Sequence, residues 1–368
     1  MSTKKDKFSK LDIKYMKLAL VLASARQGLT GTNPSVGCLI VKNNKIISIG
    51  QTGFNGRPHA EFNAIKNTNE NLNGAKIYIT LEPCNHYGRT PPCTNSIIKS
   101  KIGEVIYSIN DIDKKVRGKS LKILQRNNII VKKGLLKIST EDFYKPYFFN
   151  RKKKMPYVTG KIAISKNNLI FSKGTPRITD KYSDKLTHLL RYKNDSLLIS
   201  KKTLNIDNPK LNCRLKSLNK FSPNRVVLDN NLETNNKSYI FKTSNPNNTI
   251  FFYNKASKSK ILTFKKKKIK IIKSNLSNRK YFDLKQMLKK LYNIGCRNLL
   301  VEGGNDLTIS FLKKKLFNEF YLFKSPIKLS KFVCYKNFDA QKLLSRTFKK
   351  LVKINTKLGK DKITLYRN

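Results

Sequence analysis

The sequence is short of several residue types. Its 368 residues include no tryptophan, three histidines, and 22 acidic residues against 77 lysines and arginines. No stretch approaches the ~18 consecutive apolar residues of a membrane-spanning helix, so we expect no transmembrane segment and no membrane partner. The chain opens with Met1-Ser2-Thr3-Lys4-Lys5-Asp6, which is no apolar signal region, and its six cysteines are widely scattered. We therefore expect a reduced, cytoplasmic protein rather than a disulfide scaffold.

The excess of basic residues gives a net charge of +55, which invites a nucleic-acid or membrane-surface interpretation. However, 63 of these residues are lysine and 14 are arginine, whereas recognition of phosphates and bases favours arginine. Lysine is spread over the whole chain beside abundant asparagine and isoleucine, all residues of A/T-rich codons, so mutational bias explains the pattern without a partner. Clusters such as 265–268 and 313–315 then indicate solvated faces, and we expect no specific nucleic-acid partner.

Metal-binding residue types occur in an order typical of zinc deaminases. His59-Ala60-Glu61 is followed by Pro83-Cys84 and then by Cys93. One imidazole and two thiolates suit a catalytic zinc ion, which keeps its fourth position open for water, and Glu61 is a carboxylate placed to move that water's proton. The Pro-Cys-x-x-Cys spacing usual in zinc deaminases is not met, because eight residues separate these cysteines. His86, between the cysteines, is an alternative ligand, and ordinary buried side chains are the alternative to a metal site.

The flanking residues place this motif at the ends of regular elements. Ile77–Leu81 predicts a strand that runs directly into Pro83-Cys84. Cys93–Ile102 predicts a helix with Cys93 at its N-terminus, where the helix dipole favours a thiolate. His59 and Glu61 are two residues apart, so both can face one metal ion only if they lie in the first turn of a helix.

The chain is long enough for two domains, each predicted to alternate strands and helices in an α/β layer arrangement. Around Lys145–Lys154 the first alternation gives way to aromatic and basic residues, and we place the boundary there, between domains 1–150 and 151–368. The strands expected in the first domain are Val36–Val41, Ile46–Ile49, Ile77–Leu81, Val105–Ile109 and Ile129–Val131, with helices at Glu61, at Cys93 and over Leu121–Gln125.

The second domain starts a new series at Pro156. Its last expected strand ends at Gly303-Gly304 before a helix from Asn305, a junction suited to holding phosphate on backbone N–H groups, although glycine pairs also end strands for steric reasons. The other expected elements are strands Tyr157–Ile164, Leu197–Ser200, Arg225–Asp229, Thr249–Tyr253, Lys268–Ile272 and Asn298–Glu302, and helices Asp180–Tyr192 and Phe282–Ile294.

Taken together, these residues resemble the bifunctional pyrimidine deaminase/reductase family of riboflavin biosynthesis over essentially the whole chain. The first half carries the resemblance in Asn33–Cys38, Pro58–Glu61 and Leu81–Cys93, including the long spacing between the cysteines. The resemblance implies a cytidine-deaminase-like three-layer domain, in which His59, Cys84 and Cys93 bind Zn²⁺ and Glu61 is the proton donor. It also implies a following dihydrofolate-reductase-like α/β domain that uses NADPH.

The second half matches the family's reductase in runs such as His188–Arg191, Asp207–Pro209 and Val301–Gly304. By resemblance, the residues that bind the phosphorylated sugar substrate are Thr175, Arg191, Leu211, Arg214 and Glu302. Those that contact NADPH are Ala163, Arg177, Thr203, Asp207, Asn230 and Gly304.

The implied reactions are zinc-dependent deamination of 2,5-diamino-6-ribosylamino-4(3H)-pyrimidinone 5′-phosphate and NADPH-dependent reduction of its ribosyl chain to ribityl. The alternatives are a deaminase with a decayed reductase half, or an RNA-directed base deaminase or nucleic-acid-binding protein. A homo-oligomer is left open. The chain departs from the family pattern at Thr52 (usually His), Ser120 (Gly), Ser165–Asn168 (Ser-Leu-Asp-Gly), Arg177 (Trp), Lys201-Lys202 (small residues) and Asn208 (Asp).

Overall fold

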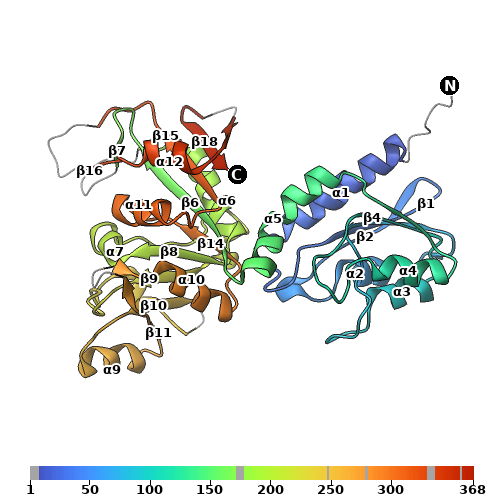
Figure 1. The fold of residues 1–368 in the computed structure, drawn as a ribbon, viewed down its shortest axis with the longest axis horizontal. Helices are drawn as coiled ribbons and strands as arrows, with labels where there is room; N and C mark the ends of the chain where they lie inside the picture. Colours follow the sequence, from blue (N-terminus) through green and yellow to red (C-terminus); the bar gives the residue numbers. More distant parts are fainter. Residues whose placement is uncertain (1–7, 171–177, 247, 278–280, 330–335, 357–358) are drawn as a thin grey trace. The chain divides into compact units, whose positions relative to one another are not determined.

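The computed structural model describes residues 8–170, 178–246, 248–277, 281–329, 336–356 and 359–368. The chain divides into two compact units, one ending at Lys153 and one beginning at Lys154, close to the boundary predicted after residue 150 (Figure 1). Both units are layered α/β structures, which confirms the predicted fold class.

The first unit contains a five-stranded sheet in the order β2-β1-β3-β4-β5. β1 is antiparallel to β2 and β3, whereas β3, β4 and β5 are parallel. The carboxyl ends of these parallel strands therefore lie at one edge, where loops can gather functional side chains. The bounds are β1 (Gly37–Lys42), β2 (Lys45–Gln51), β3 (Lys76–Leu81), β4 (Glu104–Ile109) and β5 (Ile130–Lys133).

Helices cover both faces of this sheet, so the unit has three layers (Figure 1). α1 (Lys10–Ala25) and α5 (Lys137–Lys153) lie on one face. On the other face lie α2 (Ala60–Lys66), α3 (Cys93–Lys99) and α4 (Lys119–Arg126), and a short 3-10 turn, η1 (Phe54–Gly56), precedes α2.

The sequence prediction was wrong about the segment before the boundary, because residues 145–153 continue α5. The helix buries Thr140 and Tyr144, one turn apart, and Tyr147 and Phe148 are partly buried one turn further on. This helical stripe is hard to recognise in the sequence, since it is interrupted by Pro146 and embedded in a run of aromatic residues. α1 was also not predicted.

The second unit contains a nine-stranded sheet in the order β11-β10-β9-β8-β14-β6-β15-β18-β17. The strands from β11 to β15 in this order are parallel, and β18 and β17 complete the sheet in antiparallel pairing. The bounds are β6 (Tyr157–Ile164), β8 (Ser196–Ser200), β9 (Asn224–Leu228), β10 (Thr249–Tyr253), β11 (Lys270–Lys273), β14 (Asn298–Val301), β15 (Glu319–Lys324), β17 (Lys350–Ile354) and β18 (Lys362–Arg367). The sequence analysis missed β15, β17 and β18.

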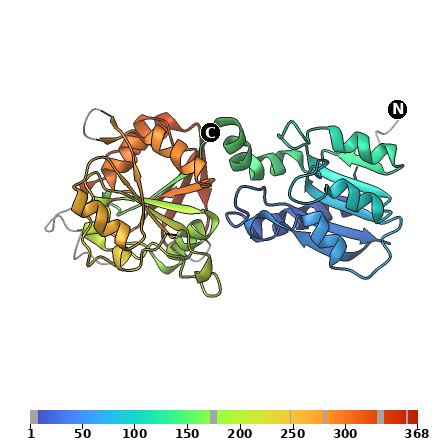
Figure 2. The same cartoon turned by 90° about the horizontal axis from the view of Figure 1, so that it is seen from below.

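Helices again flank both faces of the sheet (Figure 2). One core cluster takes its helical residues from α10, α11 and α12, and the other from α6, α7, α8 and α9. The bounds are α6 (Lys181–Lys193), α7 (Lys201–Asp207), α8 (Tyr239–Lys242), α9 (Lys258–Lys266), α10 (Leu284–Asn293), α11 (Asn305–Lys313) and α12 (Gln341–Thr347), with a 3-10 turn η2 (Asn219–Phe221). Two short ribbons pair β7 (Leu169–Ile170) with β16 (Lys336–Asn337) and β12 (Leu276–Ser277) with β13 (Tyr281–Phe282).

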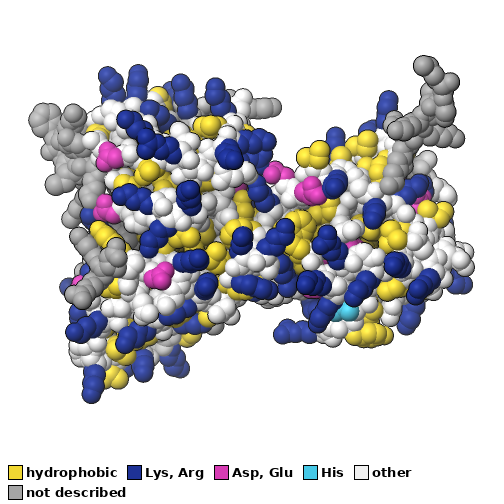
Figure 3. Space-filling view, in the orientation of Figure 1, with side chains coloured by type: hydrophobic (Ala, Val, Ile, Leu, Met, Phe, Trp, Pro, Cys, Tyr) yellow, Lys and Arg dark blue, Asp and Glu magenta, His cyan; other side chains and the backbone are white. Residues whose placement is uncertain are grey.

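The surface is basic without a dominant patch on the face shown in Figure 3, where lysine and arginine side chains are scattered over both units. Across the parts of the chain that the structure describes, no helix combines the length and the apolar character that crossing a bilayer requires.

α2 packs closely against β2 at Gly50. A Cβ atom added to Gly50 would lie 2.1 Å from the carbonyl oxygen of Ala60 and 2.9 Å from the Cβ of Ala64. We therefore expect Gly50→Ala to push α2 off the sheet and to reduce the free energy of unfolding by about 1–3 kcal/mol, the usual cost of overpacking. Urea denaturation measures this loss. Ile49→Ala, at a 48% exposed neighbouring position, is the control and should change stability by no more than about 0.5 kcal/mol.

Candidate functional site

Three potential metal ligands from separate segments of the first unit converge on one point. The Nδ1 atom of His59 lies 3.5 Å from the Sγ atom of Cys84 and 3.4 Å from the Sγ atom of Cys93. All three ligand atoms lie within 4.8 Å of one another, and His86, the alternative ligand, is not part of this group. One imidazole and two thiols are the donor types that zinc prefers, so the residues fit the metal.

Each ligand lies where a regular element begins or ends. His59 is the N-cap of α2 and Glu61 lies in its first turn, the geometry that the two-residue spacing required. Cys93 is the first residue of α3, as predicted, and its backbone N–H donates to the Sγ of Cys84 at 3.3 Å. Both helices thus present their N-termini to the cluster, where their dipoles favour negative charge. The hydrogen bond with Cys84 and burial nevertheless raise the pKa of the Cys93 thiol.

Glu61 lies beside the ligands and is 4% exposed. Burial, together with the negative charge of Cys84, raises the pKa of Glu61 to about 7. A hydrogen bond from the Cys93 thiol, with others from His59 and the backbone, lowers the pKa of Cys84 to about 4. A carboxyl group with a pKa near 7 can both accept and release a proton at neutral pH, which is what a general acid-base residue requires.

A buried carboxylate holds the loop that carries Cys84. Glu82 accepts hydrogen bonds from the backbone N–H groups of Asp111, Gly118 and Ser120 at 3.3, 3.0 and 3.3 Å. The hydroxyl of Ser120 donates to the carbonyl oxygen of Pro83 at 2.6 Å, so this departure from the family's glycine adds a contact to the metal-binding loop. Thr52, where the family usually has histidine, accepts from the backbone of Val36 at 2.9 Å.

Two of the potential metal ligands, His59 and Cys84, line a cavity of 140 Å³. Its inner part is formed by buried residues, among them Val36, Thr52, Glu61 and Leu81. The sequence analysis gave no role to the partly exposed residues that complete the lining, because they come from distant loops and from α5, which was not predicted; these are Asn33, Arg57, Tyr147 and Arg151. His86 also lines the cavity, and its Nδ1 is buried without a hydrogen-bond partner in the described part of the chain.

In the second unit, Arg191 and Glu302 form a buried two-point ion pair. Nε and Nη2 of Arg191 donate to Oε1 and Oε2 of Glu302, both at 2.7 Å, and the side chains are 11% and 13% exposed. Burial alone would raise the pKa of Glu302, but the charge and hydrogen bonds of Arg191 outweigh it and hold that pKa below its usual value. Arg191 also donates to the carbonyl oxygen of Asn212 at 3.0 Å, which ties the pair to the loop after α7.

Two residues without a predicted role join this pair. Lys161 on β6 interacts electrostatically with Glu302 and Arg191, and burial lowers its pKa. His188 on α6 accepts from the backbone N–H of Arg214 at 3.3 Å, while burial and the charges of Arg191 and Arg214 lower its pKa to about 4. His188 is therefore neutral at physiological pH. Two sequence signals pointed to Lys161, the alternation along β6 and a match to the reductase family's pattern, but neither gave it a role.

Thr203 and Gly304, two of the predicted cofactor residues, lie at the carboxyl edge of the parallel strands. α7 begins directly after β8, and α11 begins after a three-residue segment that follows the neighbouring strand β14, so their N-termini lie side by side. A Cβ on Gly304, the N-cap of α11, would lie 3.8 Å from the Oγ1 of Thr203. The adjacent Asn305 has a buried Oδ1 without a partner among the described residues. The two helix N-termini suit a dinucleotide's phosphates, whereas the Asn305 oxygen, an acceptor, would need a donor such as a hydroxyl group.

The remaining predicted residues lie at several other positions in the second unit. Asp207 ends α7, one turn after Thr203, Asn230 follows β9, and Ala163 lies near the end of β6. Leu211 is 2% exposed and lies in the loop that also carries Arg214. Thr175 and Arg177 lie outside the described residues.

Family comparisons match both units. The cytidine and deoxycytidylate deaminase zinc-binding region matches residues 9–109, and the RibD C-terminal domain matches residues 156–355. The riboflavin biosynthesis protein RibD of Aquifex aeolicus is 34% identical over 318 residues, covering 86% of this chain and 87% of its own. The same protein of Buchnera aphidicola is 34% identical over 340 residues, with coverage of 86% and 87%.

This chain belongs to the RibD family. Solved structures agree: RibD of Acinetobacter baumannii has a TM-score of 0.79 at 26% identity, covering 97% of this chain and 99% of its own. The diaminohydroxyphosphoribosylaminopyrimidine deaminase/5-amino-6-(5-phosphoribosylamino)uracil reductase of Thermotoga maritima has a TM-score of 0.79 at 28% identity, with coverage of 97% and 98%. The predicted family is confirmed.

Three departures from the RibD pattern in the second unit are accommodated locally. Asn168, where the family has glycine, adopts a φ of 62°, a left-handed conformation that asparagine tolerates better than most residues. Lys201 pairs with Glu233 at 2.6 Å and Lys202 with Asp306 at 3.3 Å, so acidic partners offset both added charges.

The Arg191–Glu302 pair gives a stability prediction. We expect Glu302→Gln to destabilise the second unit by about 3–5 kcal/mol, because it leaves the buried guanidinium without an opposing charge. Hydrogen exchange of the amides of β14 and α6 reports this loss. Asp306→Asn, which breaks a pair whose side chains are 55% and 60% exposed, should change protection little. Equal effects of the two substitutions would contradict a structural role for the buried pair.

Proposed function

We propose that the first unit deaminates 2,5-diamino-6-ribosylamino-4(3H)-pyrimidinone 5′-phosphate, with His59, Cys84 and Cys93 as the zinc ligands. The observation that carries the proposal is the convergence of one imidazole and two sulfur atoms beside a buried carboxyl group at the floor of a small cavity. When bound, zinc acidifies water and so supplies hydroxide near neutral pH.

Glu61 is the proton carrier in this proposal. It takes a proton from the attacking water and delivers it to a ring nitrogen and to the departing amine. Its pKa of about 7 applies to the metal-free cluster, and a nearby cation lowers the pKa of a carboxyl group further towards the proton-accepting form. His86, with an unpartnered Nδ1 in the same cavity, is available to hydrogen-bond the pyrimidine and fix its orientation.

We further propose that the second unit reduces the ribosyl chain of the deaminated product to ribityl. NADPH supplies the hydride, and Thr203, Gly304, Ala163, Asp207, Asn230 and Arg177 are the residues proposed to bind it. Arg191, Arg214, Glu302, Leu211 and Thr175 would hold the phosphorylated substrate, with the Arg191–Glu302 pair fixing the position of one guanidinium. Lys161, next to this pair, can donate a proton to an oxygen of the sugar as hydride arrives at carbon.

The alternatives receive less support. A decayed reductase could have lost its substrate-binding residues, whereas Arg191, Arg214 and Glu302 are all present. An RNA-directed base deaminase or a nucleic-acid-binding protein does not account for the second unit, which matches the RibD C-terminal domain over residues 156–355. A cytoplasmic location and a homo-oligomer stay predictions.

Glu61→Gln should abolish ammonia release while zinc remains bound, because the amide cannot carry the proton but Glu61 is not a ligand. Cys93→Ser should lose both metal and activity, since a neutral hydroxyl replaces a thiolate. Metal analysis and ammonia release from the diaminopyrimidinone substrate distinguish these results, and one zinc per chain is expected in the parent. Near-normal deamination by Glu61→Gln would refute the assigned role.

Reduction is tested by supplying the deaminated ribosylaminouracil phosphate directly and following the absorbance of NADPH. We expect oxidation of NADPH in preference to NADH. Arg214→Ala should raise KM about tenfold or more, the effect of losing a charge-assisted phosphate contact, whereas Lys216→Ala in the same loop should not. No oxidation above the enzyme-free control, from protein that still deaminates, would mean that the reductase has decayed.

A further inference from the structure

The cavity above the metal ligands carries two guanidinium groups that the metal chemistry does not use. Arg57 precedes α2 and Arg151 lies in the last turn of α5, and both line the same cavity as His59 and Glu61. Both are partly exposed, whereas Glu61, Leu81 and Thr52 in the same cavity are 4%, 2% and 2% exposed. The two guanidinium groups therefore lie on the solvent side of the cavity, and the buried residues form its inner end.

Neither guanidinium is committed to an acidic partner in the described part of the chain. Arg57 donates a hydrogen bond to the hydroxyl of Thr90, and Arg151 lies over the ring of Tyr147 at 5.2 Å from its centroid. Asp111 in the cavity lining interacts electrostatically with Arg151, but no ion pair joins the two among the described residues; the Oδ1 of Asp111 accepts from the Tyr147 hydroxyl at 3.2 Å and from the backbone of Asp113 at 3.0 Å. Most of the donors of both arginines are thus available to a ligand.

The size of the cavity indicates which part of the substrate the arginines meet. At 140 Å³ it is smaller than the roughly 300–1,000 Å³ of pockets that enclose whole small molecules. The space next to the metal ligands can hold a pyrimidine ring, and the ribosyl phosphate must then lie at the solvent side. Guanidinium groups bind phosphate oxygens through paired N–H donors.

We propose that Arg57 and Arg151 bind the 5′-phosphate of the substrate while its pyrimidine ring occupies the deaminase cavity, an inference that rests on the proposed deaminase function. The chain folds these two residues together from positions 94 residues apart in the sequence. They act on substrate binding, so their loss raises KM and leaves the proton transfer by Glu61 in place.

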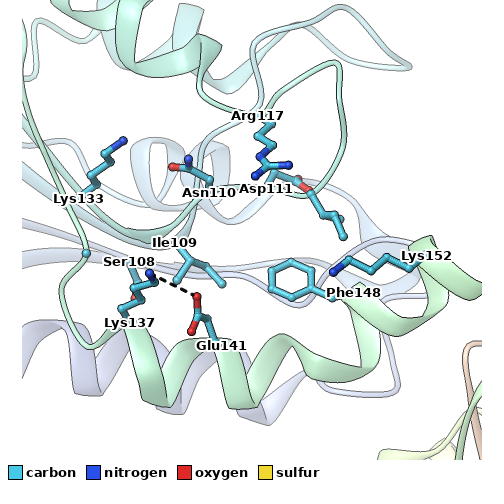
Figure 4. A pocket seen from close by; sticks show the side chains of 12 residues that line it. Ser108, Ile109, Asn110, Asp111, Arg117, Lys133, Lys137, Glu141, Phe148 and Lys152 are labelled. Atoms are coloured by element: carbon cyan, nitrogen blue, oxygen red, sulfur yellow. Dashed lines mark ion pairs between the residues drawn. The ribbon is translucent and has the colours of Figure 1, made fainter.

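A neighbouring groove offers a competing position for the phosphate. This 630 Å³ groove shares Asp111 with the cavity and is lined by Arg117, Lys133, Lys137 and Lys152, with Lys137 paired to Glu141 at 3.8 Å (Figure 4). It contains none of the metal ligands, and for that reason we assign the phosphate to the arginines. Arg151 and Lys152 are consecutive in α5 but line different spaces, which gives a matched control.

The test compares ammonia release from the phosphorylated substrate and from its dephosphorylated ribosylamine, using the zinc-loaded full chain. We expect Arg57→Ala and Arg151→Ala each to raise KM for the phosphorylated substrate about tenfold or more, with kcat within about twofold. For the dephosphorylated substrate, parent and variants should have the same KM. Arg57→Lys and Arg151→Lys, which keep the charge and lose the paired donors, should fall between parent and alanine variants, and Lys152→Ala should match the parent.

Parent-like KM values in both arginine variants would overturn the proposal, as would a rise in KM confined to Lys152→Ala, which would assign the phosphate to the groove. An equal loss of activity on both substrates would also overturn it, because the arginines would then act on the ring or the fold. Absence of ammonia release by the zinc-loaded parent from either substrate would instead refute the deaminase function itself.

Discussion

The first unit is organised around the meeting of one imidazole and two sulfur atoms at the carboxyl edge of β3. These atoms lie within 4.8 Å of one another, and the hydrogen bond with Cys84 and burial raise the pKa of the Cys93 thiol, so the surrounding structure has to hold the group together. It does so with two helix N-termini and with the Glu82 carboxylate, which accepts three backbone N–H groups from the loop beside Cys84. α2, which carries Glu61, is in turn held against the sheet by its close packing on β2 at Gly50.

In the second unit, as in the first, the site lies at the carboxyl edge of parallel strands, but the residues that form it are different. Parallel strands bring β6, β8 and β14 to end at one edge, and the residues that follow them meet there. The electrostatics is built on the Arg191–Glu302 pair, in which the arginine holds the pKa of the acid below its usual value. Burial, together with the charge of the arginine, also lowers the pKa of His188, so this histidine is neutral over the physiological pH range.

The net charge of +55 affects the two sites in different ways. Beside the cofactor edge, Lys201 and Lys202 are paired with Glu233 and Asp306, so the added charge is offset locally. Around the deaminase cavity Arg57 and Arg151 form no ion pair among the described residues, although Asp111 interacts electrostatically with Arg151, and a phosphorylated substrate can supply further opposing charge. The basic residues beside the cofactor edge are therefore neutralised by acidic partners, whereas those at the deaminase cavity are placed to bind a phosphate. Local ion pairing distinguishes the two cases.

The sequence by itself determined the α/β class, the metal-binding motif and the position of most elements around it, because strand alternation and the spacing from His59 to Glu61 are local properties. It could not reveal α5, whose buried stripe is obscured by Pro146 and neighbouring aromatic residues, and so it missed Tyr147 and Arg151 at the cavity. Only the tertiary structure decided that Lys161 joins Arg191 and Glu302, and that Arg57 and Arg151 share one cavity. Contacts between distant segments depend on how helices pack across a sheet, and local sequence does not encode that geometry.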